Sequence, residues 1–420
     1  MSTTIDICTE NKASHNHEKH NKVSFIFSVW YFISKHGEKH GKKIIHSIKV
    51  GTALVLVSLL YLLDPLFEHV GENGMWAIMT VVVVYDFFAG ATLSKGLLRG
   101  IGTILGGGLG CLAASLAEDF GNTGFTVVVG TSVFISGAVA TYCRMIPSIK
   151  RKYDYGVMIF ILTFNLVAVS GLRADKILEL ARQRLFTIGM GFAVCIITSL
   201  LIFPMWAGDE LHKTTSYKFN KLASCIEECM EAYFSDSKKK GQLSINVDSC
   251  KSILHSKSSE ESQANFAKWE PWHGKFGFCY PWEMYLEIGD LLRELVSIVL
   301  SLQACIASPL HPSTTILQHQ TIKETCTNVG LSLGVIMRGL GESIMKMRRN
   351  REKVLIQAKL QSIKLELNRV STSELRSLEN VEALAVSNLL FLTTTEIVNK
   401  VQLLAEKVEQ LGEVAGFESK

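Results

Sequence analysis

The first half of the chain contains six long apolar segments, and these constrain the fold more than any other feature. Each has roughly 17–21 residues, the length that an α-helix needs to cross the hydrocarbon of a bilayer. The chain has 420 residues and is 48% hydrophobic, which is high for a soluble protein of this size. We therefore expect an all-α membrane protein with six transmembrane helices. The segments are residues 49–67, 74–91, 97–117, 124–142, 155–171 and 185–203.

The character of the sequence changes near Trp206, where apolar segments give way to charged, helix-forming sequence. Clusters of Lys and Arg precede the first segment and occupy every second loop, which the positive-inside rule places in the cytosol. Both termini are then cytosolic. We expect a flexible His-rich cytosolic tail at residues 1–41, a six-helix transmembrane domain at 42–205 and a cytosolic helical domain at 206–420.

The last part of the chain carries heptad patterns. Apolar residues recur there at alternating four- and three-residue steps, as in a coiled-coil seam. The sequence leaves open whether these seams pack within one chain or between two chains. The residues are Ile397, Val401, Leu404, Val408 and Leu411, with a second set at Ile356, Leu360, Ile363 and Leu367.

Two further local predictions concern loops and thiols. The stretch "HSKSSEES" at 255–262 has the composition of a solvated polar loop. The ten cysteines are scattered, with no CxxC pair and no zinc-ligand spacing. Cys225 and Cys229 stand four residues apart, which fits one helix face as well as a ligand pair. We interpret all ten cysteines as reduced thiols.

Several classes of protein are excluded. The chain has no GxSxG, HExxH or Walker motif, so we expect no enzyme activity, no cofactor and no confident metal site. The glycines at 106, 107, 108 and 110 suit close packing of membrane helices better than a nucleotide loop. A net charge of +4, without a basic patch interleaved with aromatic residues, gives no reason to expect a nucleic-acid partner.

Charged residues at the second and third segments need a separate explanation. Asp86 lies within an apolar run, where an acid costs about 2.5–3.5 kcal/mol on insertion scales. We expect it to pair with Lys95 or Arg99 as a structural counter-ion beside a permeation path. Lys95 and Arg99 are four residues apart and share a helix face. The alternative is that they are ordinary interfacial cations that extend to the lipid headgroups.

Several long motifs resemble the plant aluminium-activated malate transporter family, whose members are anion channels. The resemblance runs in order from about residue 42 to 310. The chain has Asp86 where the family usually has Glu, and it departs from the family pattern after Trp269-Glu270-Pro271. The motifs are "MWAIMTVVVVYDFFAGATLSKGLLRG" at 75–100, "YDYGVMIFILTFNLVAVSG" at 153–171 and "WEPWHGKFGFCYPWEMYLEIG" at 269–289.

The resemblance implies an anion channel for malate and other small anions, formed by a homodimer with basic residues inside its pore. Arg99 and Arg184 match positions that the family keeps basic, with Lys95 as a support. Met79 matches an apolar constriction, with simple packing as its alternative. We expect an integral, multi-pass protein of the lipid bilayer, in the plasma membrane rather than the vacuolar membrane.

Three outer acidic residues are candidates for sensing a cation. Glu68, Asp175 and Glu179 match acidic positions in family members that respond to external aluminium. Hard cations prefer carboxylate oxygens, so converging carboxylates could bind such an ion. The alternative is that all three are solvated acids that balance nearby basic residues.

Two other functions compete with the channel. One is a proton-coupled secondary organic-anion transporter related to bacterial efflux permeases, which would favour broken helices and a titratable residue at the bilayer centre. The other is a membrane-anchored signalling scaffold, which leaves the intramembrane charges unexplained.

Overall fold

The computed structural model describes residues 41–59, 62, 74–118, 121–170, 177–233, 247–277, 279–307, 320–349, 353–374 and 381–418. The regular elements within these ranges are all helices. The chain divides into two compact units, with the boundary in the sequence between Met205 and Trp206. We call residues up to 205 the membrane unit and residues from 206 the helical unit. The N-terminal tail that the sequence predicts lies almost entirely outside the described residues.

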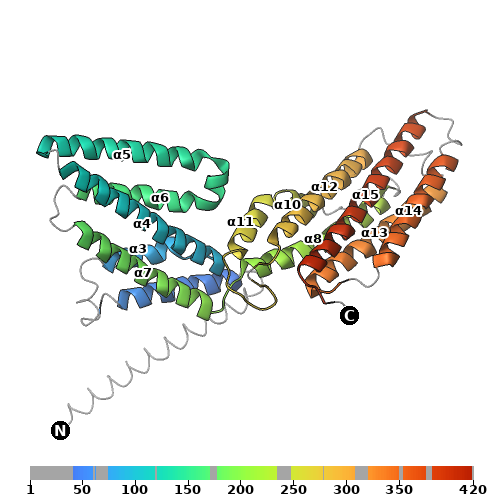
Figure 1. Cartoon of the computed structure of the whole chain (residues 1–420). Helices are drawn as coiled ribbons and strands as arrows, with labels where there is room; N and C mark the ends of the chain where they lie inside the picture. The colour runs from blue at the N-terminus through green and yellow to red at the C-terminus, as the bar shows by residue number, and fades with distance from the viewer. Residues whose placement is uncertain are drawn as a thin grey trace, which may run out of the picture. The chain divides into compact units, whose positions relative to one another are not determined.

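The membrane unit is a bundle of apolar helices (Figure 1). Four of its helices are long and apolar enough to cross a bilayer: Ala89–Ala117, Gly124–Met145, Pro147–Ser170 and Arg182–Leu201. The all-helical class is therefore confirmed, while the count of six spans stays a prediction. The helices are residues 41–59, α3 (Met75–Val84), α4 (Ala89–Glu118), α5 (Gly121–Met145), α6 (Pro147–Ser170) and α7 (Ile177–Leu201).

The second predicted span is not one continuous helix. Ten-residue α3 extends only about 15 Å, half of the roughly 30 Å of bilayer hydrocarbon, and a break at 85–88 separates it from α4. In the break, Phe87 N–H donates to Asp86 Oδ1 at 2.6 Å, and Asp86 N–H donates to Thr92 Oγ1 at 3.0 Å. Such local side-chain bonds compete with the helical pattern. The sequence predicted one continuous span here because residues 74–91 are almost all apolar.

Glycines bring α4 and α6 into direct backbone contact. A Cβ atom at Gly102 would lie 2.6 Å from Gly156 O, and one at Gly106 would lie 2.7 Å from Phe160 O. Gly110 approaches Val167 and Phe164 in the same way, which completes a row at four-residue spacing. Small residues at this spacing are a common device of membrane helix pairs, because they let backbones approach closely.

The α5–α6 connection is shorter than the sequence suggested. Only Ile146 separates the two helices, so the basic residues expected in a loop lie within helical turns. Arg144, at the end of α5, donates to both carboxylate oxygens of Asp154 on α6, at 2.7 and 3.1 Å. This ion pair joins the two helices beside the turn.

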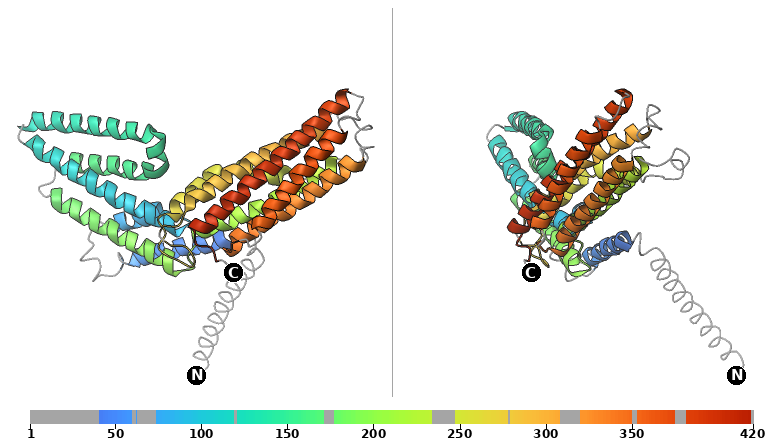
Figure 2. Two further views of the ribbon diagram at one scale, coloured as in Figure 1. Left: turned by 45° about the vertical axis from the view of Figure 1, so that its right-hand side comes forward. Right: turned by 90° about the vertical axis from the view of Figure 1, so that its right-hand side faces the viewer.

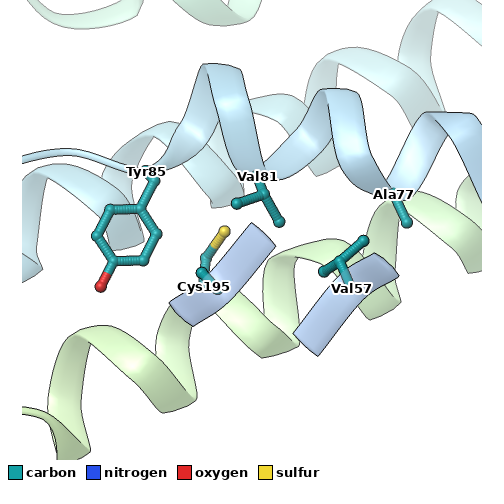
Figure 3. Close-up of a cluster of buried hydrophobic side chains, with 6 residues drawn as sticks. Val57, Ala77, Val81, Tyr85 and Cys195 are labelled. Carbon is teal, nitrogen blue, oxygen red and sulfur yellow. The ribbon is translucent and has the colours of Figure 1, made fainter. Parts of the chain in front are cut away.

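Helix 41–59 packs against α3 and α7. Figure 3 shows Val57, Ala77, Val81, Tyr85 and Cys195 converging in one buried cluster. Near this cluster, Lys49 is 1% exposed, and its Nζ donates to Ser199 O and Phe203 O at the end of α7. A cation at a helix C-terminus satisfies unpaired carbonyls and opposes the negative end of the helix dipole.

The helical unit is a bundle of amphipathic helices, whose long members lie side by side in Figures 1 and 2. The heptad residues Ile397, Val401, Leu404, Val408 and Leu411 are all buried within this one chain. Their seam is therefore intramolecular. The helices are α8 (Ala207–Tyr233), α10 (Val247–Leu254), α11 (Lys257–Ala267), α12 (Trp282–Ala307), α13 (Gln320–Lys346), α14 (Lys353–Glu374) and α15 (Val381–Val414).

Two local predictions for this unit were wrong. Most of the predicted loop at 255–262 belongs to α11, because Glu260 is buried and bound to partners on other helices. Cys225 and Cys250 are joined as a disulfide, where the sequence predicted thiols. The fold brings α8 and α10 together. The two cysteines are 25 residues apart in the sequence, and this spacing does not predict a disulfide.

Candidate functional site

The membrane unit contains a cavity of about 620 Å³ lined by residues of α3, α4, α6 and α7. Most of its lining is apolar or glycine, including Gly107 and Gly108 on α4. Its charged residues are three arginines: Arg99 on α4, and Arg182 and Arg184 on α7. Among the described residues that line the cavity, none is acidic. The cavity is thus a basic chamber between apolar helices.

Arg99 is a deeply buried charge with little compensation. It is 5% exposed, and its Nη1 donates to the Tyr155 hydroxyl at 3.4 Å. Its Nε has no hydrogen-bond partner among the described residues. A buried cation normally requires a carboxylate or several acceptors nearby. Arg99 therefore retains an unsatisfied donor beside the cavity.

Arg184 reaches the same chamber from α7. Its guanidinium carbon lies 4.9 Å above the centre of the Trp76 ring, a cation–π contact that holds the side chain across α3 and α7. Its Nε, like that of Arg99, lacks a partner within the described ranges.

Thr103 adds a third unsatisfied polar atom. Its hydroxyl oxygen is buried without a hydrogen-bond partner in the described part of the chain, and it lines the same cavity. Native structures pair the great majority of buried polar atoms. Arg99, Arg184 and Thr103 thus each line one cavity and each carry a buried polar atom without a partner among the described residues.

Lys95 lies outside this cavity lining and is paired. Its Nζ lies 2.6 Å from Asp86 Oδ2, with the two side chains 34% and 27% exposed. Asp86 thus joins the break at 85–88 to the first part of α4 and does not reach Arg99 by any described contact. Met79 is 48% exposed and does not line the cavity either.

The three outer acidic candidates fall in regions that the structure does not describe. Glu68 and Asp175 lie outside the described residues, and Glu179 is in α7 without a described side chain. Within the residues that are described, no group of three or more His, Cys, Asp or Glu side chains is arranged for a metal.

Sequence reasoning named Arg99 and Arg184 but missed their neighbours around the cavity. Trp76 and Tyr155 both lie in the motifs quoted above, and Thr103 follows Arg99 by one helical turn. The four-residue spacing of Arg99 and Thr103 is a readable signal. The pairing of Trp76 with Arg184 is not, because the two residues are 108 positions apart in the sequence.

Apolar helices long enough to cross a bilayer, with a cavity lined by three arginines among them, define an α-helical membrane protein. Residues 34–379 match the family described as "Aluminium activated malate transporter". The chain therefore belongs to the aluminium-activated malate transporter family.

Individual relatives agree with this assignment. Aluminum-activated malate transporter 13 of Arabidopsis thaliana is 41% identical over 327 residues, covering 76% of this chain and 60% of the relative. Aluminum-activated malate transporter 2 of the same plant is 38% identical over 391 residues, covering 91% and 77%. Aluminum-activated malate transporter 1 of Triticum aestivum is 35% identical over 386 residues, covering 89% and 80%. The chain spans about 60% of the length of the first of these.

Proposed function

We propose that this chain forms an anion channel that conducts malate, and other small anions, across a plant membrane. The cavity lined by Arg99, Arg182 and Arg184 is the observation that carries the proposal. An anion that leaves water loses favourable hydration free energy. Fixed positive charges along its path compensate for this loss and repel mobile cations. The role needs neither a cofactor nor a catalytic group, and the names of the relatives support transport.

A comparison of the Coulomb attraction with the desolvation cost favours several arginines that each bind the anion weakly over one arginine that binds it strongly. A unit charge about 4 Å from a guanidinium gains about 4 kcal/mol at an effective dielectric constant near 20. Moving an ion from water into protein costs several kcal/mol. One arginine therefore roughly balances the cost for a single charge, and a dianion needs two. Arg99 and Arg184 meet this need without trapping the anion.

The remaining site residues take supporting roles in this proposal. Asp86 holds Lys95 at the entrance to α4, and Met79 narrows the path where two protomers meet. Glu68, Asp175 and Glu179 form an outer cation sensor. The channel is a homodimer with six spans per chain and cytosolic termini, and we place it in the plasma membrane.

Electrical recording of the purified full chain in planar bilayers tests the proposal. With potassium malate at a higher concentration on one side than on the other, the reversal potential should follow the malate gradient and not the potassium gradient. Discrete open and closed levels should appear in single-channel records. A reversal potential that follows the cation gradient, or the absence of any current when vesicle flux shows that the protein is active, would overturn it.

The break at 85–88 favours one alternative, a proton-coupled carrier. Discontinuous helices beside a titratable residue are typical of secondary transporters, and Asp86 stands in the break. A carrier would show malate uptake into vesicles that rises with an imposed proton gradient and no unitary current. A channel would show flux set by the malate gradient and voltage alone.

A further inference from the structure

The membrane unit has a second large cavity, lined by α4, α5 and α6, which shares no lining residue with the arginine chamber. Its volume is about 690 Å³, within the range of about 300–1,000 Å³ that is typical of ligand sites. Its lining on α4 extends from Leu98 to Leu116, about 27 Å of helix, which is most of a bilayer hydrocarbon of about 30 Å. Among the described residues that line it, none is charged.

α5 forms one side of this cavity and contains the least buried of the four candidate spans. Only 11% of its apolar window is buried, against 39% of the window in α4. α5 packs on α4 and α6 through a buried cluster that includes Ala113, Val129 and Ala168. Other large apolar side chains that line the cavity, such as Leu105 and Ile135, stay more than half exposed. Exposed apolar surface around a cavity is typical of a site that a ligand or partner covers.

One end of the cavity lies at the turn between α5 and α6, and this end is basic. Cys143 and Tyr153, on either side of the turn, both line the cavity. Lys150 is exposed and stands three residues before Tyr153, so the two side chains share a face of α6. The acid of this turn, Asp154, already accepts hydrogen bonds from Arg144 on both of its oxygens. The apolar wall therefore ends beside an exposed cation.

We propose that this cavity binds one anionic phospholipid, with an acyl chain along α4 and the headgroup phosphate at Lys150. An uncharged wall suits the acyl chain, and a lysine at its end attracts an anionic headgroup. The positive-inside rule predicts that the α5–α6 turn is cytosolic, and the cytosolic leaflet is the one that holds the anionic lipids. Tyr153 lies at this end, and tyrosine is typical of the headgroup level.

A second copy of the chain is the competing occupant, and charge argues against it. Two copies related by a two-fold axis along the membrane normal would hold their α5–α6 turns at the same depth. The exposed Lys150 and Arg151 of one copy would then approach the same residues of its partner, and like charges oppose association. A lipid phosphate brings the opposite charge. This inference does not depend on the proposed channel function.

Native mass spectrometry of the full chain, titrated with lipid in micelles, tests the headgroup contact. The wild type should hold one phosphatidylserine per chain, at least about fivefold more tightly than phosphatidylcholine with the same acyl chains. Lys150→Gln should lower the affinity for phosphatidylserine about fivefold and leave that for phosphatidylcholine unchanged. The matched control is Lys152→Gln, which removes an equal charge from the opposite side of α6 and should bind as the wild type does. Equal affinity of the wild type for both lipids would overturn the proposal.

A second pair of variants tests the cavity itself in the same titration. Ser136 lines the cavity from α5, so Ser136→Trp fills the space of the acyl chain and should retain neither lipid. The control is Ala138→Trp, which places the same ring at an exposed position of α5 outside the lining and should retain both. Undiminished lipid binding by Ser136→Trp would overturn the proposal, and so would a loss of dimer mass in place of lipid mass. Lys150→Gln alters only an exposed side chain, so its result decides the matter even where Ser136→Trp fails to fold.

Discussion

Arg99 in the membrane unit and Lys218 in the helical unit are two cations with the same burial and different surroundings. Each is 5% exposed. The Lys218 ammonium contacts the Glu260 carboxylate and donates to Ser256 Oγ at 2.9 Å. Arg99 has the Tyr155 hydroxyl at 3.4 Å and an Nε with no partner among the described residues.

The difference separates a charge that is neutralised within the fold from one that keeps an unsatisfied donor beside a cavity. Burial lowers the pKa of Lys218 to about 8, so it is still charged at neutral pH and depends on Glu260 for neutralisation. Glu260 also binds Arg293 at 2.7 Å, and the cluster is complete without any ligand. Arg99, by contrast, has no carboxylate among its described contacts.

The largest expected effect comes from removing the counter-ion of Lys218. Glu260→Gln leaves Lys218 and Arg293 buried without their shared carboxylate, and breaking a buried pair costs about 3–5 kcal/mol. The free energy of local unfolding should fall by that amount, measured by hydrogen exchange of α8 and α12 amides in the full chain. The control is Glu287→Gln, whose exposed pair with Lys407 is worth less than about 1 kcal/mol. Equal effects would show that Lys218 does not need its partner.

A smaller loss is expected where the membrane unit packs most closely. Gly106→Ala places a Cβ atom against the Phe160 carbonyl and should destabilise the unit by about 1–3 kcal/mol. The thermal unfolding midpoint of the solubilised protein measures it. Gly100, on the same helix, has open space around its Cβ position, so Gly100→Ala should be neutral or stabilising. If the two variants behave alike, contact between α4 and α6 does not hold the cavity wall.

The ion pair between Asp86 and Lys95 is partly exposed, so its contribution to stability should lie between that of a buried pair and that of a fully exposed pair. Asp86→Asn keeps an oxygen for Phe87 N–H but loses the ion pair, and we expect a loss of no more than about 1 kcal/mol. The loss should shrink as salt is added, because solvent ions screen exposed pairs. Asp86→Glu should be milder. A salt-independent loss of several kcal/mol would mean that this pair resembles the buried Lys218 cluster instead.

The smallest effect concerns pH. Burial lowers the pKa of His212, against a weaker opposing effect of the Met345 carbonyl, and Nδ1 lies 2.8 Å from the Tyr285 hydroxyl. The unfolded chain therefore binds this proton first as the pH falls below 6.5, and stability falls until the folded-state pKa is reached. His212→Gln should flatten the pH dependence of the unfolding midpoint in this window. Mutation of the exposed His255 to Gln should leave it unchanged.

The apolar segments and their glycines were readable because each signal is local. A run of some 20 apolar residues, or glycines four positions apart, carries its meaning within one helix. The family resemblance, together with the position of these residues at the ends of apolar segments, placed Arg99 and Arg184 as candidates before their common cavity was known. The sequence alone left open whether these arginines are pore charges or interfacial cations. The choice depends on how exposed each side chain is, and exposure is set by the fold.

What the sequence could not reveal depends on contacts between distant residues. Glu270 caps α8 across 62 positions, Cys225 meets Cys250 across 25, and Glu260 is buried by partners on α8 and α12. The break at 85–88 was missed for a different reason. Its polar bonds involve Asp86 and Thr92, two side chains whose pattern is common in continuous helices as well.

Anion selectivity of arginine variants tests the account most directly. In planar bilayers with a malate gradient, Arg99→Gln and Arg184→Gln should each lower the conductance by at least about tenfold, and their reversal potentials should move away from the malate value. Lys152→Gln, which removes an exposed charge of the same unit, should match the wild type. Neither arginine variant should lose folded protein, because each removes a charge with an unsatisfied donor. Unchanged conductance and reversal potential in both arginine variants would contradict the claim that this cavity is the anion path.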